Sequence, residues 1–205
     1  ASNGAGTSGW GTTALASQPV TITGTVYRAA SATILPATVN LGNVRAGSAV
    51  SSSSVTVSNL VPNDGFSDRL RVTSGPASNN FELTGSFTLN AGSSGVLPVA
   101  YTGSTVVAGL KSGTLLVDLV SVGQAGTGLA DLPLSSGTVS VSASVFRPAV
   151  PMVAATSLDL GDIREGQAFS TRFVSIRNDA TADAYSEKLN AQFGVVTGSV
   201  TTSGG

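Results

Sequence analysis

The chain repeats itself, and this repeat most constrains how the chain can fold. Residues 20–59 superpose without a gap on residues 139–178, at an offset of 119 residues. Arg28 then falls on Arg147, and Leu41 falls on Leu160. A period of this length corresponds to a whole domain rather than to one coil of a solenoid, because a module of this size buries enough surface to stand alone. We therefore expect successive copies of one independently folding module.

The same offset extends towards both ends of the sequence. The glycine-rich residues 4–18 fall on residues 123–137, while Gly205 corresponds only to Ser86. We therefore expect three parts: residues 1–28 as the C-terminal strand of a preceding repeat, residues 29–148 as a complete repeat, and residues 149–205 as the N-terminal half of a following repeat. The short apolar stretches at 29–37 and 148–156 are the expected joints, which predicts end-to-end packing of adjacent modules.

Composition and periodicity both favour strands over helices. Glu occurs three times and Lys twice, so the residues that usually build exposed helices are nearly absent. Short alternating or β-branched runs between Gly, Asn and Pro predict strands at 20–27, 39–44, 54–58, 70–73, 81–89, 96–101, 114–120 and 138–146. Within the run 114–120, Leu115, Val117 and Leu119 share one face, which we expect to lie on the core, and Asp118 points away. The predicted fold class is all-β, with tandem immunoglobulin-like antiparallel β-sandwiches.

The missing residue types exclude many functions. The chain contains neither His nor Cys, which removes imidazole catalysis, thiol nucleophiles and the usual zinc sites. A net charge of −1 gives no basic patch for nucleic acid, and no apolar run approaches the roughly 18 residues of a membrane helix. We expect no enzyme activity, no nucleic-acid partner and no membrane insertion within this segment.

Several motifs that carry chemistry in other proteins have simpler explanations here. Residues 4–9 spell G-x-G-x-x-G, but they precede a strand instead of following one, so we interpret them as a loop. Acidic groups at 64–68 and 179–187 could supply oxygen ligands for calcium, the second loop more readily than the first, where too few carboxylates converge; we favour ordinary solvated acids. A catalytic pair of carboxylates would need two acids that face each other across a cleft. Glu82 and Asp118 are the only acids between residues 68 and 131, and they lie on strands that need not be neighbours. We assign no catalytic, cofactor-binding or metal-binding residue and expect no cofactor.

Other recurring or isolated residues point to structural roles. Arg28 and Arg147 each follow the same apolar strand, and we expect their guanidinium groups to bond backbone carbonyls of the next module. Asp64 could form an ordinary solvated pair with Arg69. Trp10 falls on Leu129, so we expect it to cap a core edge rather than to bind a sugar.

Turn-forming residues recur at the start of each repeat. Asp159 and Asp162 replace Asn40 and Asn43, which indicates that these positions need a turn former rather than a carboxylate. Asn59, repeated as Asn178, is placed to tie a bend through its side-chain amide.

The stretch LGNVRAGSAVSSSSVTVSN, residues 41–59, and its copy at 160–178 resemble the opening of immunoglobulin-like modules of the abnormal-spindle and hydin type. In bacteria such modules occur in exported repeat proteins of the choice-of-anchor D type. The residues at 108–119 also fit the later hairpin of that family. In this pattern Gly42 and Gly47 permit a tight reversal, and Val44 or Ile163 closes the end of the sandwich. The resemblance implies a fold more than a function.

Two functions follow as hypotheses. The first is a structural segment of an exported bacterial surface protein, a stalk, fibre or adhesin backbone, at the cell surface or outside the cell. Its partners would be neighbouring copies of the module or chain, associating head to tail if residues 1–27 complete the half repeat of another copy. We expect residues 20–27 to pack on the complete module, and the half repeat to be covered by another chain or by residues further along. The alternative is a module that recognises a cell-surface glycan or protein through loops at one end, where Phe66, Tyr185 and Trp10 lie.

Overall fold

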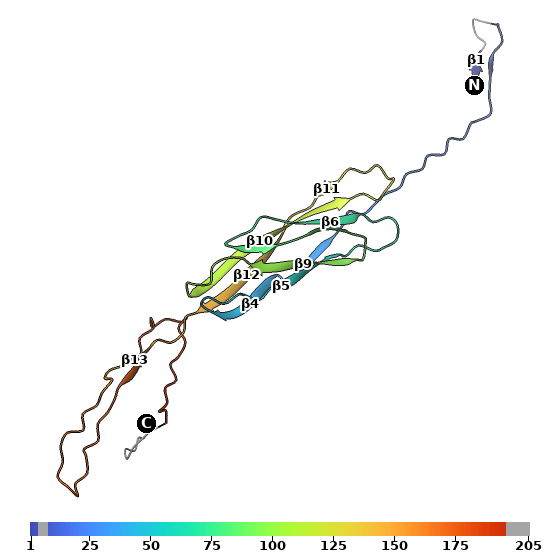
Figure 1. Cartoon of the computed structure of the whole chain (residues 1–205). Helices are drawn as coiled ribbons and strands as arrows, with labels where there is room; N and C mark the ends of the chain where they lie inside the picture. The colour runs from blue at the N-terminus through green and yellow to red at the C-terminus, as the bar shows by residue number, and fades with distance from the viewer. Residues whose placement is uncertain (4–7, 196–205) are drawn as a thin grey trace.

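The structure is a computed structural model that describes residues 1–3 and 8–195. A β-sandwich occupies the middle of an elongated molecule (Figure 1). The N-terminal segment leaves one end of the sandwich, and the second repeat leaves the opposite end. The described residues include no helix, and hence none with the length and apolarity to cross a membrane. The prediction of an all-β, immunoglobulin-like fold is confirmed.

Two sheets form the sandwich. The smaller sheet has the order β3-β5-β9-β7, and the larger has the order β4-β12-β10-β6-β8, with β11 paired to β10. Their bounds are β3 Ala32–Leu35, β4 Thr38–Arg45, β5 Ser53–Asn59, β6 Arg69–Ser74, β7 Phe81–Leu83, β8 Ser86–Leu89, β9 Ser94–Tyr101, β10 Gly109–Val122, β11 Leu132–Pro133 and β12 Gly137–Phe146. All these pairs are antiparallel except β4 with β12, which run parallel.

The parallel pair contains a bulge where the sequence places a glycine. Ser142 is opposite Asn40, but Ser144 is opposite Asn43, so β4 carries one extra residue at this point. Gly42 lies in the bulge with φ of 89°, a conformation that side chains other than glycine rarely adopt. The Asn40 Oδ1 accepts a 2.8 Å hydrogen bond from the Gly42 N–H. Asn40 therefore acts as the predicted turn former.

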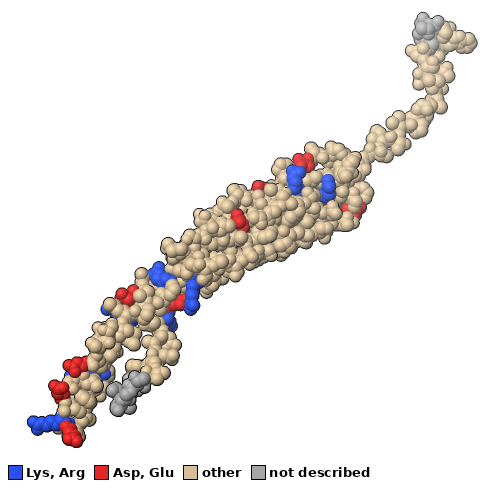
Figure 2. Space-filling model, viewed as in Figure 1, with Lys and Arg blue, Asp and Glu red and all other residues tan. Residues whose placement is uncertain are grey.

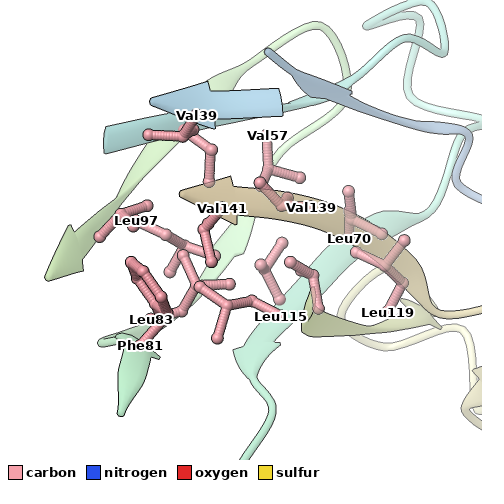
Figure 3. Close-up of a cluster of buried hydrophobic side chains, with 14 of the residues drawn as sticks. Val39, Val57, Leu70, Phe81, Leu83, Leu97, Leu115, Leu119, Val139 and Val141 are labelled. Atoms are coloured by element: carbon pink, nitrogen blue, oxygen red, sulfur yellow. The ribbon is translucent and has the colours of Figure 1, made fainter. Parts of the chain in front are cut away.

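Alternating residues of both sheets fill the core (Figure 3). Leu115, Val117 and Leu119 of β10 are buried, whereas Asp118 is exposed, as the alternation predicts. The fully buried apolar side chains are Val55, Val57, Leu70, Val72, Phe81, Leu97, Leu115, Val99, Val117, Val139 and Val145. All of them except Val145 belong to one cluster of buried side chains in the core.

Two strand predictions and one predicted joint need correction. The predicted strand 81–89 is two strands, because the chain crosses between the sheets at Gly85, where φ is 127°. The expected joint at 29–37 contains β3, an edge strand of the sandwich. Residues 20–27 form no strand, and their apolar side chains Val20, Ile22 and Val26 are exposed. The expectation that this segment packs on the complete module therefore holds only at Tyr27, whose ring lies against Phe66, and is wrong for residues 20–26.

The described part of the second repeat reproduces the start of the first. Its strands β13, Pro151–Val153, and β14, Ile176–Asn178, pair in the register that β3 and β5 use 119 residues earlier. The Asp159 Oδ1 accepts a 2.8 Å hydrogen bond from the Gly161 N–H, as Asn40 does from Gly42. This confirms that the position serves as a turn former.

The second repeat nevertheless forms no closed sandwich in its described residues. Leu158, Val174 and Ile176 are 42–44% exposed, whereas their equivalents Val39, Val55 and Val57 are no more than 4% exposed. Near the N-terminus, β1 at Ser2–Asn3 pairs with β2 at Thr12–Thr13, away from the sandwich.

Candidate functional site at the module joints

The repeat places the same backbone contact at both ends of the sandwich. Arg28 donates its N–H to the Phe66 carbonyl at 2.8 Å, and its own carbonyl accepts the Asp68 N–H at 2.8 Å. At the other end, Arg147 bonds the Tyr185 carbonyl at 2.9 Å and the Glu187 N–H at 3.0 Å. We call residues 27–28 with 64–68 the first joint, and residues 146–147 with 183–187 the second joint. Each joint ties a connecting segment to a loop of the repeat that follows it.

The arginine side chain of each joint binds a carboxylate and a hydroxyl group. The Arg28 Nη1 donates to Asp64 Oδ2 and, at 3.4 Å, to Ser67 Oγ. The Arg147 Nη1 donates to Asp183 Oδ2 at 2.8 Å and to Ser186 Oγ at 3.5 Å. Both guanidinium groups thus bind side-chain oxygens, so the expectation that they bind backbone carbonyls is wrong.

The ion-pair partner of Asp64 also differs from the predicted one. Its ion-pair partner is Arg28, while the Arg69 Nη2 donates to the Gly123 carbonyl at 3.3 Å. The backbone bridge between Arg28 and Ser67 brings the loop that carries Asp64 next to Arg28. Asp64 Oδ1 also accepts the Phe66 N–H at 2.9 Å, which fixes the carboxylate in the turn.

These hydrogen bonds lower the pKa of both joint carboxylates. The Phe66 N–H, followed by the Arg28 side chain, holds the pKa of Asp64 below its ordinary value of 3.8. The Tyr185 N–H is the main cause of the lowered pKa of Asp183, with smaller contributions from Ser186 and Arg147. Both carboxylates are therefore ionised at neutral pH and face a permanent positive charge.

An aromatic pair accompanies each arginine. The rings of Tyr27 and Phe66 have centroids 6.0 Å apart at 46°, and those of Phe146 and Tyr185 are 5.8 Å apart at 53°. These are tilted packings of the kind that aromatic pairs prefer. The two loop aromatics that could have favoured a recognition surface are thus used within the joints.

An asparagine supports each joint loop from behind, buried at Asn59 and half-buried at Asn178. Asn59 accepts the Ser31 N–H at 3.2 Å and donates its Nδ2 to the Asp68 carbonyl at 3.1 Å. Asn178 accepts the Val150 N–H and donates to the Glu187 carbonyl, both at 2.9 Å. The predicted role of this asparagine in tying a bend is confirmed at both copies.

The second joint has a further ion pair that crosses between modules. The Arg45 Nε, at the end of β4, donates to the Glu187 Oε1 at 2.6 Å, and this contact raises the pKa of Arg45. Asp68 stands at the position equivalent to Glu187. Its Oδ2 accepts the Ser121 hydroxyl at 2.8 Å, while its buried Oδ1 has no hydrogen-bond partner among the described residues.

Charged side chains are unevenly distributed along the molecule. Figure 2 shows charged side chains at the two ends of the sandwich and along the second repeat, with few on the middle of the visible face. The ion pairs at these ends include Arg28 with Asp64 and Arg147 with Asp183.

The remaining candidates form no common site. Residues 4–7 of the first glycine motif lie outside the described residues, and its copy at 123–128 forms the expected loop between β10 and β11. Glu82 lies between two buried residues of β7 and Asp118 between two of β10, so the two carboxylates point away from the core on opposite sheets. Within the described ranges, no group of three acidic residues is placed to hold a metal ion.

Two smaller expectations fail. Trp10 is 77% exposed and caps no core edge, because the segment that carries it lies away from the sandwich. Val44 is only half-buried, and Ile163 is 41% exposed, so neither closes a sandwich end.

Sequence reasoning also missed the tyrosine or phenylalanine before each arginine and the Arg45–Glu187 pair. The recurrence of Asp64, Phe66 and Ser67 at the common offset was a usable signal for the joint.

No family model and no curated protein matches the chain. Among solved structures, it is similar to the ASH/PapD-like domain 7 of human CEP192, with a TM-score of 0.43, 8% identity, and coverage of 66% of this chain and 99% of that domain. A protein of unknown function from Porphyromonas gingivalis W83 gives a TM-score of 0.45 at 14% identity, with 60% and 55% covered. The MSP family member WR4 of C. elegans gives 0.38 at 11% identity, with 58% and 100% covered.

Proposed function

We propose that this chain is a structural, non-catalytic segment of an exported bacterial surface protein of the choice-of-anchor D type. In this proposal residues 1–28 end one repeat, residues 29–148 form a complete repeat and residues 149–205 begin the next. The modules act as a stalk, fibre or adhesin backbone, and the joints set the direction from each module to the next.

The observation that carries the proposal is the duplicated joint. The same arginine, carboxylate, hydroxyl, aromatic pair and asparagine recur 119 residues apart at both ends of one sandwich. A module that worked alone would need such contacts at neither end. Arg147 makes two backbone and two side-chain hydrogen bonds across its joint, which restrains rotation about the connection.

The exposed surface supports the same function. Only 10% of the residues are charged, and serine and threonine supply 53 of 205. A surface of this kind depends little on screened ion pairs away from the joints, so its stability changes little with salt. That property suits a protein outside the cell.

Removal of one repeat period from the protein as the cell makes it tests the proposal. Deletion of residues 29–147 joins Arg28 to Pro148, so the joint is rebuilt in phase. We expect a surface projection that is shorter by one module, still folded, and reached by antibodies on intact cells. Deletion of residues 29–120, which breaks the period, is the control and should disrupt the array. Antibody labelling only after the cells are permeabilised would contradict the surface location, and an unchanged projection length would contradict the stalk.

A further inference from the structure

Three loops of the complete sandwich meet beside Tyr27 and enclose a hollow of about 500 Å³. They follow strands β5, β8 and β10, and each brings one carboxamide side chain to the hollow: Asn63, Asn90 and Gln124. The first two loops lie side by side, because a Cβ added to Gly92 would lie 3.9 Å from the Asn63 Cβ. The volume is within the range of about 300–1,000 Å³ that small-molecule sites have.

The lining of the hollow is polar but uncharged. Besides the carboxamides it contains the Tyr27 ring and the Thr127 hydroxyl. A carboxamide both donates and accepts hydrogen bonds, so it can satisfy two neighbouring hydroxyl groups of a ligand. Asn63 and Asn90 are exposed, and their side chains make no hydrogen bond to the described residues. Their donors and acceptors are therefore available to a ligand.

The other lining groups are held in place before a ligand binds. The Gln124 Nε2 donates to the Ser67 carbonyl at 2.7 Å, which leaves its Oε1 to accept a bond from a ligand. The Thr127 hydroxyl donates to the Gln124 carbonyl at 2.7 Å and so orders the same loop. The Tyr27 ring packs against Phe66 with their centroids 6.0 Å apart. Groups that are already ordered lose less conformational entropy on binding.

The polar lining does not recur in the repeat, although the joint contacts do. At the offset of 119 residues the pairs are Tyr27 with Phe146, Asn63 with Ala182, and Gln124 with Ala5. The second joint thus keeps its arginine, carboxylate and aromatic contacts without the phenol hydroxyl and without the carboxamide. These lining groups are therefore not needed to form a joint.

A preceding repeat leaves this face of a module open. Ala182 and Ala184, the equivalents of Asn63 and Gly65, are exposed although the sandwich contacts their loop through the second joint. The ion pair that crosses the second joint goes instead to Glu187, whose equivalent in the first repeat does not line the hollow. The hollow therefore stays accessible within an array of modules.

We propose that this hollow binds a short, uncharged saccharide. A sugar ring has an apolar face, which suits the Tyr27 ring, and neighbouring hydroxyl groups, which suit the carboxamides of Asn63, Asn90 and Gln124. An acidic ligand finds no cation in the lining, and Ala125 is too small to form an apolar pocket for a peptide side chain. The inference goes beyond the stalk function, because it gives the end of one module a ligand.

Binding of residues 1–205, carrying a fluorescent label, to immobilised oligosaccharides tests the ligand class. The array carries neutral, sialylated and sulfated oligosaccharides, with peptides printed beside them. We expect the chain to bind neutral oligosaccharides and to give no signal on the acidic ones or on the peptides. The neutral oligosaccharide with the strongest signal is then titrated into the labelled chain in solution.

Variants of the unpaired carboxamides test the place of binding. We expect Asn63→Ala and Asn90→Ala each to weaken binding about fivefold, because each removes a hydrogen bond to the sugar. Asn43→Ala is the matched control, since Asn43 is also exposed and lies on β4, near the opposite end of the sandwich. Thermal melting should be the same in all three, because none of these side chains makes a hydrogen bond to the described residues.

The absence of binding to neutral oligosaccharides, or binding to acidic oligosaccharides or peptides alone, would overturn the saccharide proposal. Equal affinities of the Asn90→Ala and Asn43→Ala variants would overturn its assignment to this hollow. Each of these results leaves the stalk function standing, because that function is tested by the projection length on cells.

Discussion

Replacement of Asn59 by alanine is expected to destabilise the sandwich strongly. The side chain is 1% exposed and bridges the Ser31 N–H, at 3.2 Å, and the Asp68 carbonyl, at 3.1 Å. Asn59→Ala removes both bonds at once and leaves two backbone groups without their partners. A buried polar group left unsatisfied costs about 1–3 kcal/mol.

The two losses together predict a decrease of about 2–6 kcal/mol in the free energy of unfolding. For a domain of this size, each kcal/mol lowers the melting temperature by about 4 °C, so we expect a shift of about 8–24 °C. Far-UV circular dichroism is the suitable probe. Trp10 fluorescence is not, because Trp10 is exposed in the segment outside the sandwich.

Asn178→Ala is the matched control. Asn178 makes the equivalent hydrogen bonds to Val150 and Glu187, but it lies beyond the sandwich. Its replacement should therefore leave the melting of the sandwich unchanged. If the two variants melted at the same temperature, the hydrogen bonds of Asn59 could not be the contacts that hold the end of the sandwich.

Two further predictions concern the joint charge and the backbone packing. The pKa of Asp183 is lowered in the folded chain, so its stabilisation of the second joint is complete above the ordinary pKa of 3.8 and is lost as the pH falls through the lowered value. Small-angle scattering should show a straight joint at pH 7 and a loosened one in acid. A joint that is equally straight in acid would contradict this prediction. Gly75→Ala should destabilise the sandwich by about 1–3 kcal/mol, because its Cβ would lie 2.8 Å from the Leu116 Cβ and 2.9 Å from the Leu116 carbonyl oxygen. Gly24→Ala, which has nothing within 4 Å, is its control and should be neutral in the same thermal melts.

Most of the sandwich could be predicted because alternation is a local signal. The residues of β10 alternate between buried and exposed as the pattern of Leu115, Val117 and Asp118 requires. The turn at Gly42 was also predictable, since only glycine adopts its backbone conformation readily. These features depend on neighbours in the sequence, so one sequence is enough to find them.

The failures come from contacts between distant residues. Residues 20–27 have the pattern of a strand, but a pattern supplies no partner, and none of the described residues pairs with them. Strand β3 was hidden in an apolar stretch that equally suits a linker. The partner of Arg28 is 36 residues away, and no local rule selects Asp64 over a backbone carbonyl. The repeat does show that Asp64 recurs as Asp183, but it does not identify Arg28 as the partner of Asp64.

The central claim is that the arginine joint fixes the direction from one module to the next. Two spin labels, introduced by Thr114→Cys on the sandwich and Lys188→Cys beyond the second joint, would be the only thiol sites in the chain. Pulsed electron resonance should give one narrow distance distribution, broadened several-fold by Arg147→Ala and unchanged by the control Arg28→Ala, which acts at the other joint. A distribution that is equally broad with and without Arg147 would contradict the claim.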